Sequence, residues 1–174
     1  MIKKKLSIIL IFSLIIFILS VFFISLGKNK IYDTKDLIGK DIGAFQLTSW
    51  NDNQKINEEF LKKNKFTLIN FFASWCAPCR AEHKYLIKLS ENSKNLKILG
   101  INFKDEKTKA EKWLKDSGNP YYFIAKDSNG KISIKFGIYG IPESILVDEN
   151  LNILKKFIGP LNKEEYKNIL KLTS

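Results

Sequence analysis

The segment from residue 66 to residue 91 constrains the fold most, because an apolar stretch, two cysteines and a helical pattern follow one another directly. Residues 66–72 are mostly apolar or aromatic, which indicates a buried strand, and apolar residues then recur at helical spacing. Cys76 and Cys79 lie at the junction, with Pro78 in the first helical turn, where a missing N–H group is tolerated. The free N–H groups and the dipole at this helix end favour the thiolate of Cys76 over its thiol.

The two-residue spacing places Cys79 one helical turn after Cys76, so the two sulfurs can meet and close a small ring. We expect Cys76, nearer the helix end, to be the exposed nucleophile and Cys79 to be the shielded resolving thiol. A purely structural disulfide is poorly motivated, because so small a ring removes little entropy from the unfolded chain. Zinc takes about four ligands, and besides the two cysteines the chain has a single histidine, His83. The C-x-x-C pattern therefore favours a redox pair, and no metal site is expected.

The formal net charge of +11 raises the question of a nucleic-acid partner. Residues 1–30 hold five lysines and no acids, so 24 basic and 18 acidic residues remain for the rest of the chain. These charges are interspersed and form no basic stripe with interleaved aromatic residues. The pattern indicates a lysine-rich solvated surface, and no nucleic-acid partner is expected.

The N-terminal region has the pattern of a membrane anchor. Lys3, Lys4 and Lys5 precede 21 uncharged residues, 6–26, which as a helix would span about 30 Å, the thickness of a hydrocarbon core. A cleaved signal peptide is the alternative, although its apolar region would be shorter and Ser25-Leu26-Gly27 only weakly resembles a cleavage site. We predict an uncleaved anchor over residues 1–27, a linker over 28–38 and one domain over 39–174. The lysines keep the N-terminus cytoplasmic, so the domain lies outside the membrane, where disulfide chemistry is possible.

Beyond the linker, strands and helices alternate. A weak hairpin pattern covers residues 43–56, residues 57–63 form a short helical or turn segment, and residues 131–139 are ambiguous between strand and helix. The other predicted strands are 67–72, 96–103, 121–125, 144–147 and 153–158. The predicted helices are 77–91, 107–117 and a last one that Asn162 and Glu165 open with a capping-box pattern. This order predicts an α/β sandwich with a mixed central sheet flanked by helices.

The segment Gly140-Ile141-Pro142-Glu143 is the second informative stretch. A proline that opens a buried strand cannot donate to the hydrogen-bond ladder, so it belongs at an edge or in a special turn.

With both stretches in view, the chain resembles the thioredoxin-like superfamily, and more specifically the DsbE/CcmG-type thiol–disulfide oxidoreductases of cytochrome c maturation. The residues that carry the resemblance are 75–83 (WCAPCRAEH), 100–105 (GINFKD), 118–121 (GNPY) and 137–144 (GIYGIPES). They span roughly residues 39–172, in the order of the family.

The resemblance implies a thioredoxin-like fold with an N-terminal β-hairpin, a central insert at about residues 121–137 and a cis bond between Ile141 and Pro142. It implies an enzyme without a cofactor, anchored in the bacterial cytoplasmic (inner) membrane with its catalytic domain on the periplasmic side. Its substrates would be disulfides of apocytochrome c or of a maturation partner. A DsbD/CcdA-like donor in the membrane would keep it reduced.

The resemblance also assigns roles around the cysteines. Pro142 would shape a substrate groove that Trp75, Pro78 and Ile141 line, and Trp75 would cover the site. Glu143 is the candidate for tuning the pKa values of the cysteines.

Two residues depart from the pattern. Ser144 stands where the family usually has threonine, and Asn70 stands where thioredoxins keep a buried acid, so proton exchange with Cys79 needs another group. Glu143 is nearest to the site by sequence. Glu82 is either a second tuning carboxylate or a surface residue, and His83 is expected on the helix surface.

Two other functions remain open. The chain could be a general extracytoplasmic reductase of the ResA or TlpA kind with other substrates. It could also be a non-catalytic module that docks apocytochrome.

Overall fold

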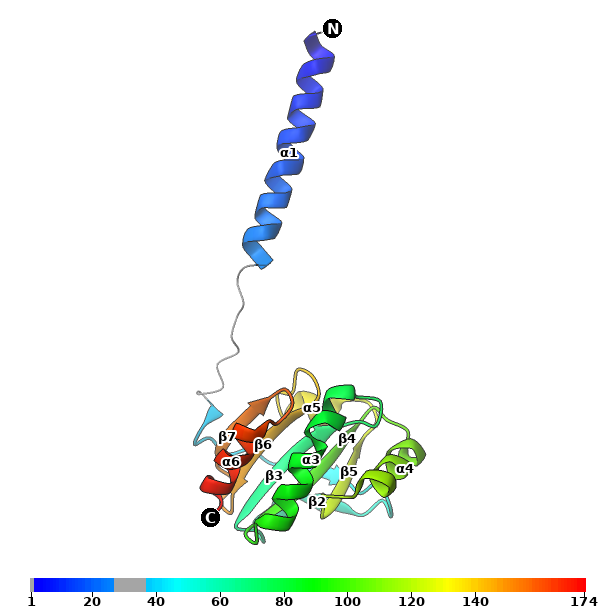
Figure 1. Cartoon of the computed structure of the whole chain (residues 1–174), viewed down its shortest axis with the longest axis vertical. Helices are drawn as coiled ribbons and strands as arrows, with labels where there is room; N and C mark the ends of the chain where they lie inside the picture. The colour runs from blue at the N-terminus through cyan, green and yellow to red at the C-terminus, as the bar shows by residue number, and fades with distance from the viewer. Residues whose placement is uncertain (1, 27–36) are drawn as a thin grey trace. The chain divides into compact units, whose positions relative to one another are not determined.

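The computed structural model describes residues 2–26 and 37–174, and the chain divides into two units, Met1–Asp33 and Thr34–Ser174. In the first unit the helix α1 spans Ile2–Leu26 (Figure 1). Its described large apolar side chains between residues 8 and 24 are exposed. Among the residues described, no helix is both long and apolar enough to cross a membrane. The anchor over 6–26 and the domain boundaries stay predictions, and most of the predicted linker, up to residue 36, lies outside the described residues.

The second unit is built on a five-stranded sheet of order β5-β4-β3-β6-β7. Its strands are β3 (Phe66–Phe72), β4 (Leu96–Phe103), β5 (Phe123–Asp127), β6 (Glu143–Asp148) and β7 (Ile153–Ile158). β4 runs parallel to both β3 and β5, whereas β6 runs antiparallel to both β3 and β7. This mixed sheet confirms the predicted α/β architecture.

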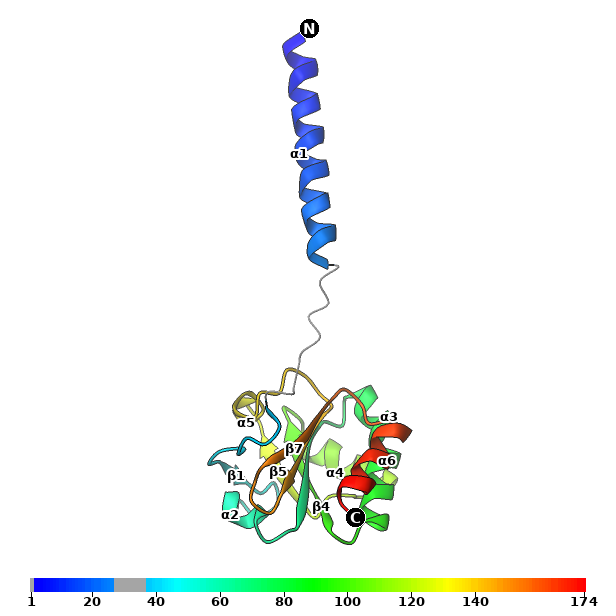
Figure 2. The same ribbon diagram turned by 90° about the vertical axis from the view of Figure 1, so that its left-hand side faces the viewer.

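Helices cover both faces of the sheet, as the edge-on view in Figure 2 shows. We call the two sides the α3 face and the α5 face. On the α3 face lie α3 (Ala77–Asn92), α4 (Lys107–Ser117) and α6 (Lys163–Leu172). On the α5 face lie the hairpin of β1 (Gln46–Thr48) and β2 (Lys55–Asn57), then α2 (Glu58–Leu61) and α5 (Lys131–Lys135).

The central strand β3 is buried on both sides and is apolar apart from Thr67 and Asn70. Leu68 and Phe72 join the core cluster of the α3 face, while Ile69 and Phe71 join that of the α5 face, and all four are fully buried. The strand is therefore packed between two cores, and the loop that leads to α3 follows its C-terminal end.

Two stretches differ from the sequence prediction. The strand expected at 121–125 is β5, Phe123–Asp127, because the Tyr121 N–H donates to the side chain of Asn119 in a turn before the strand. The ambiguous stretch 131–139 begins with α5, where the carboxylate of Asp127 accepts the N–H groups of Ile132 and Ser133. The predicted insert therefore contributes an edge strand and a short capping helix.

Candidate functional site

The two cysteines lie at the N-terminus of α3, after the short loop that follows β3. Cys76 is the N-cap residue, Pro78 follows in the first turn, and the Sγ of Cys76 accepts the N–H of Cys79 at 3.2 Å. The two sulfurs form a disulfide, so the structure shows the oxidised form of the pair. The amide contact is the helix-end environment that the sequence predicted for Cys76, and it favours negative charge on that sulfur.

The exposure of the cysteines differs from the prediction. Cys76 is 4% exposed and Cys79 is 1% exposed, so the expected contrast between an exposed and a shielded thiol is small in the disulfide form. The expectation of an exposed Cys76 is wrong for this form, because both cysteines belong to the core cluster of the α3 face. Their neighbours Trp75, 58% exposed, Ala77 and Pro78 are the accessible residues of the motif.

The loop before Cys76 is held from two sides. Asp105, just after β4, accepts the Ser74 backbone N–H and the Ser74 hydroxyl, the latter at 2.9 Å. From the other side Arg80 donates through Nε and Nη2 to the Ser74 carbonyl, at 3.0 and 2.7 Å. The Trp75 indole N–H donates to the Lys104 carbonyl at 3.2 Å, which orients the exposed ring beside the cysteines. Sequence reasoning missed Asp105, although it belongs to the GINFKD motif.

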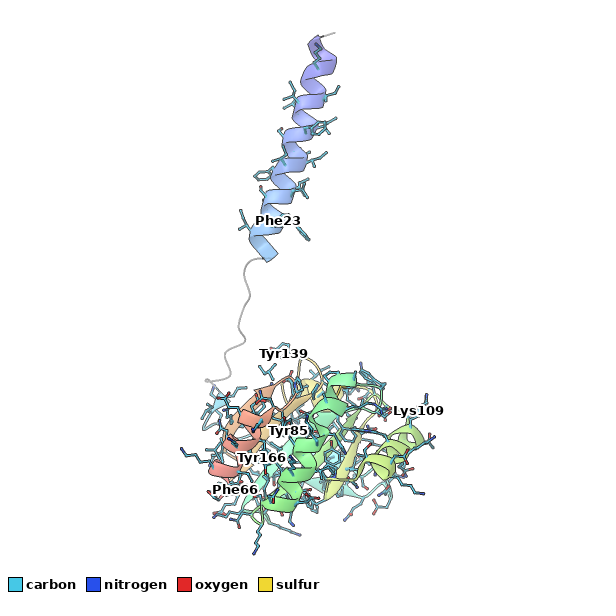
Figure 3. All side chains as sticks on the ribbon, viewed as in Figure 1. Phe23, Phe66, Tyr85, Lys109, Tyr139 and Tyr166 are labelled. Carbon is cyan, nitrogen blue, oxygen red and sulfur yellow. A yellow bond between two sulfur atoms is a disulfide. The ribbon has the colours of Figure 1, made fainter. Side chains whose placement is uncertain are left out.

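The second stretch of the site enters β6 through Pro142. The Ile141–Pro142 bond is cis, the conformation that the resemblance implied. Pro142 is buried, and Ile141 is partly buried and packs against the cluster that contains both cysteines. Nearby Tyr139 is 75% exposed at the rim of the unit (Figure 3). The structure thus brings Ile141 to the cysteines' core cluster and leaves Trp75, Pro78 and Tyr139 accessible.

The side chain of Glu143 does not lie beside the cysteines, although its position after Pro142 suggested that it would. It pairs with Phe71 across the sheet, so its side chain projects onto the α5 face, away from α3. One carboxylate oxygen accepts the N–H groups of Tyr139 and Gly140 at 3.0 and 3.2 Å, and the other lies 3.0 Å from the Lys156 ammonium. Both oxygens of the Glu143 carboxylate therefore have partners, the backbone N–H groups of the preceding loop and the Lys156 ammonium. This geometry does not favour Glu143 as the group that tunes the pKa values of the cysteines.

The buried carboxyl on the cysteines' side is Glu82, one turn of α3 beyond Cys79 and 1% exposed. It accepts the Asn70 amide at 2.8 Å and the Leu161 N–H at 2.7 Å. Burial raises the pKa of Glu82 to about 7, against the lowering effect of these two hydrogen bonds. Glu82 thus occupies the α3 face of the site with a carboxyl that titrates near neutral pH, and the surface interpretation is wrong.

Asn70 links this carboxyl to the rest of the sheet. It donates to the Ser144 hydroxyl at 3.0 Å and accepts the Tyr121 hydroxyl at 2.8 Å. Burial and the nearby charge of Glu82 raise the pKa of Tyr121 well above its ordinary value, so Tyr121 stays a donor. The two departures from the family pattern, Asn70 and Ser144, are therefore partners in one buried network beneath α3.

His83 is buried rather than on the helix surface. Its ring contacts Trp113, with centroids 4.7 Å apart, and its Nε2 lies 3.0 Å from the Gly118 carbonyl. Burial lowers the pKa of His83. No group of three potential metal ligands occurs among the residues described.

The chain is similar to known proteins in both sequence and fold. The Redoxin family matches residues 37–171. The thiol:disulfide interchange protein DsbE of Haemophilus influenzae is 38% identical over 174 residues, which covers 97% of this chain and 94% of the relative. DsbE of Escherichia coli K12 is 39% identical over 136 residues, covering 78% and 72%. The thioredoxin domain of a thiol-disulfide oxidoreductase from Bacteroides vulgatus superposes with a TM-score of 0.67 at 20% identity, covering 79% and 98%, so the fold is thioredoxin-like.

Proposed function

The chain belongs to the Redoxin family and, within it, to the DsbE thiol:disulfide interchange proteins, and from this premise we propose that it reduces disulfides of apocytochrome c or of a maturation partner. Thiol–disulfide exchange is the activity of the family. The observation that carries the proposal is the contact between the Cys76 sulfur and the Cys79 N–H at the start of α3, because it favours a thiolate at the attacking sulfur.

Exchange proceeds in two steps from the reduced pair. The Cys76 thiolate attacks one sulfur of the substrate disulfide, that S–S bond breaks, and the leaving substrate thiolate takes up a proton. Cys79 then loses its proton and attacks the Cys76 sulfur, which releases the second substrate thiol and leaves the Cys76–Cys79 disulfide. Two electrons pass to the substrate, and a dithiol donor in the membrane returns them.

The proton of Cys79 needs an acceptor in the second step. Glu82 follows Cys79 by three residues on α3, a spacing that places the two side chains on one helix face. Its carboxyl, with a pKa of about 7, is charged in part of the molecules at neutral pH and can both accept and return a proton. Within the proposal, Glu82 takes the role for which the sequence suggested Glu143.

The site of action in the proposal is the outer side of the cytoplasmic membrane, in the periplasm. It is supported by the uncharged stretch 6–26 after Lys3, Lys4 and Lys5, with its exposed apolar side chains. N-terminal sequencing of the membrane-bound protein tests the anchor. An intact Met1 supports a single-pass anchor, whereas a start near Gly27 means that the segment is a cleaved signal.

Trapping tests the exchange partners. In Cys79→Ser the second step is blocked, so mixed disulfides should accumulate through Cys76, and mass spectrometry of the captured proteins identifies the substrate. Apocytochrome c or a maturation protein among them supports the proposal. A broad set of unrelated proteins points to a general reductase instead, and accumulation in Cys76→Ser rather than Cys79→Ser inverts the two roles.

The redox potential of the couple tests the direction of transfer. A reductant that depends on a dedicated donor should have a potential near or moderately above about −270 mV, the thioredoxin value. Equilibration of the protein against glutathione and thioredoxin buffers measures it. A potential near about −120 mV means that the protein makes disulfides, which contradicts the reductive role.

A further inference from the structure

Lys156 is the lysine with the most deeply buried position among the residues described. Its side chain has no exposed area, although it lies on β7 close to the edge of the sheet. A buried ammonium is tolerated only where partners replace its water, so each of its contacts matters. Its Nζ donates to the Gly137 carbonyl at 2.6 Å, lies 3.0 Å from a Glu143 oxygen and stands 5.8 Å from the centre of the Tyr139 ring.

These contacts converge on the loop that leads to the cis-proline. The Gly137 carbonyl accepts a hydrogen bond from the Lys156 ammonium. The N–H groups of Tyr139 and Gly140 donate to the Glu143 oxygen that does not face Lys156. Gly137 has a positive φ of 63°, and its N–H donates to the Ile134 carbonyl at 2.9 Å, so local bonds fix the start of the loop. The contacts to Lys156 and Glu143 hold the residues that follow.

The strand register places the ion pair of Glu143 and Lys156 on the α5 face of the sheet, opposite to the face of the cysteines. Lys156 pairs with Ile145 across β6 and β7, and Ile145 belongs to the core of the α5 face, as does Phe71, the partner of Glu143. The cysteines belong to the core of the α3 face. Lys156 can therefore influence exchange through the loop and not through contact with the reacting sulfurs.

We propose that Lys156 is a positioning residue for disulfide exchange with protein substrates: it fixes, together with Glu143, the loop 137–142 that presents Ile141 and the cis-proline to the substrate chain. The inference rests on the proposed function, since it assumes that this loop forms one wall of the groove. The alternative is an ion pair that only stabilises the fold.

Lys156→Met and the double change Lys156→Met/Glu143→Gln separate these possibilities. The single change leaves the Glu143 charge buried without its cation. The double change removes that charge, while Gln can still accept the Tyr139 and Gly140 amides, but the Gly137 carbonyl still lacks its donor. Lys155→Met is the matched control, because Lys155 is the partly exposed neighbour on the same strand.

The assay uses the full-length chain in detergent with an oxidised peptide that carries the haem-attachment pattern C-x-x-C-H. For the double variant, the expected result is a KM raised by about tenfold, the effect of one charge-assisted hydrogen bond, with kcat little changed. Alkylation of reduced Cys76 by iodoacetamide, which needs no groove, should change by less than twofold. Lys155→Met should match the parent.

A parent-like KM in a folded double variant overturns the inference, and so does an equal rise of KM in Lys155→Met. Should the Lys156 variants not fold, hydrogen exchange of the unmutated chain decides. Protected amides at Tyr139 and Gly140 support a fixed loop, whereas exchange at the rate of a free loop overturns it. If the parent itself does not reduce the peptide, the proposed function fails, and the two failures remain distinguishable.

Discussion

Glu82 and Glu143 are two buried carboxylates on opposite faces of one sheet, and they differ in what compensates their burial. Glu82, on the α3 face, is held by the neutral N–H groups of Asn70 and Leu161. Glu143, on the α5 face, receives two backbone N–H groups and lies 3.0 Å from the Lys156 ammonium. Both are at most 2% exposed.

The difference in partners separates the carboxyl to which the proposed function assigns proton transfer, Glu82, from one that forms an ion pair, Glu143. Neutral donors do not fully offset the desolvation of Glu82, so its pKa rises to about 7 and it can gain and lose a proton near neutral pH. A full opposite charge beside Glu143 favours a fixed ion pair that organises the neighbouring loop. Burial alone therefore does not identify the functional acid; its partners do.

The largest effect is expected from separating the ion pair. Lys156→Met leaves the Glu143 carboxylate buried without a cation and should cost about 3–5 kcal/mol of the free energy of unfolding. Urea denaturation measures it. Glu143→Gln in the same background should recover more than half of the loss, because the uncompensated charge is gone. No recovery would contradict the ion-pair account.

The next effect is a pH dependence that belongs to Glu82. Its pKa is about 7 in the folded protein and ordinarily 4.5, so between these pH values the folded state holds a proton that the unfolded chain has released. Stability should therefore fall as the pH rises through this window, by about 3 kcal/mol in total. Glu82→Gln should abolish this part of the slope in urea denaturation measured from pH 4 to 8.

The matched control for that series is Glu149→Gln, which changes an exposed glutamate in the turn between β6 and β7. It should keep the parent's slope. An unchanged slope in Glu82→Gln would mean that the buried carboxyl is already ionised at acid pH, and it would remove Glu82 from the proposed proton transfer.

The smallest effect is expected at the edge of the Glu82 network. Tyr121→Phe removes the hydroxyl that donates to Asn70 and should cost about 1 kcal/mol of unfolding free energy. Tyr122→Phe is a suitable comparison, since its hydroxyl accepts from Asn64 at a more exposed position. A loss no larger in Tyr121→Phe than in Tyr122→Phe would show that the Asn70 contact adds little.

Local patterns in the sequence predicted most of the elements. The helix at 107–117 and the strands at 96–103 and 153–158 have the predicted bounds, and the capping box of Asn162 and Glu165 opens α6. These elements follow from hydrophobic periodicity and from caps within one turn, which are local. The start of β5 and the helix α5 were missed because they follow from bonds of the Asn119 and Asp127 side chains to nearby backbone N–H groups, which hydrophobic periodicity does not register.

The sequence by itself determined the redox pair at the start of a helix, since strand, cysteines, proline and helix are contiguous in the chain. Only the tertiary structure decided which carboxyl accompanies the cysteines. Glu143 follows Pro142 directly, but side chains alternate along a strand, and its register turns it to the α5 face. Glu82 lies three residues after Cys79, a spacing that keeps both on one helix face and that could have identified it. Its raised pKa depends on burial against Asn70 and Leu161, residues 12 and 79 positions away, and no local pattern contains that contact.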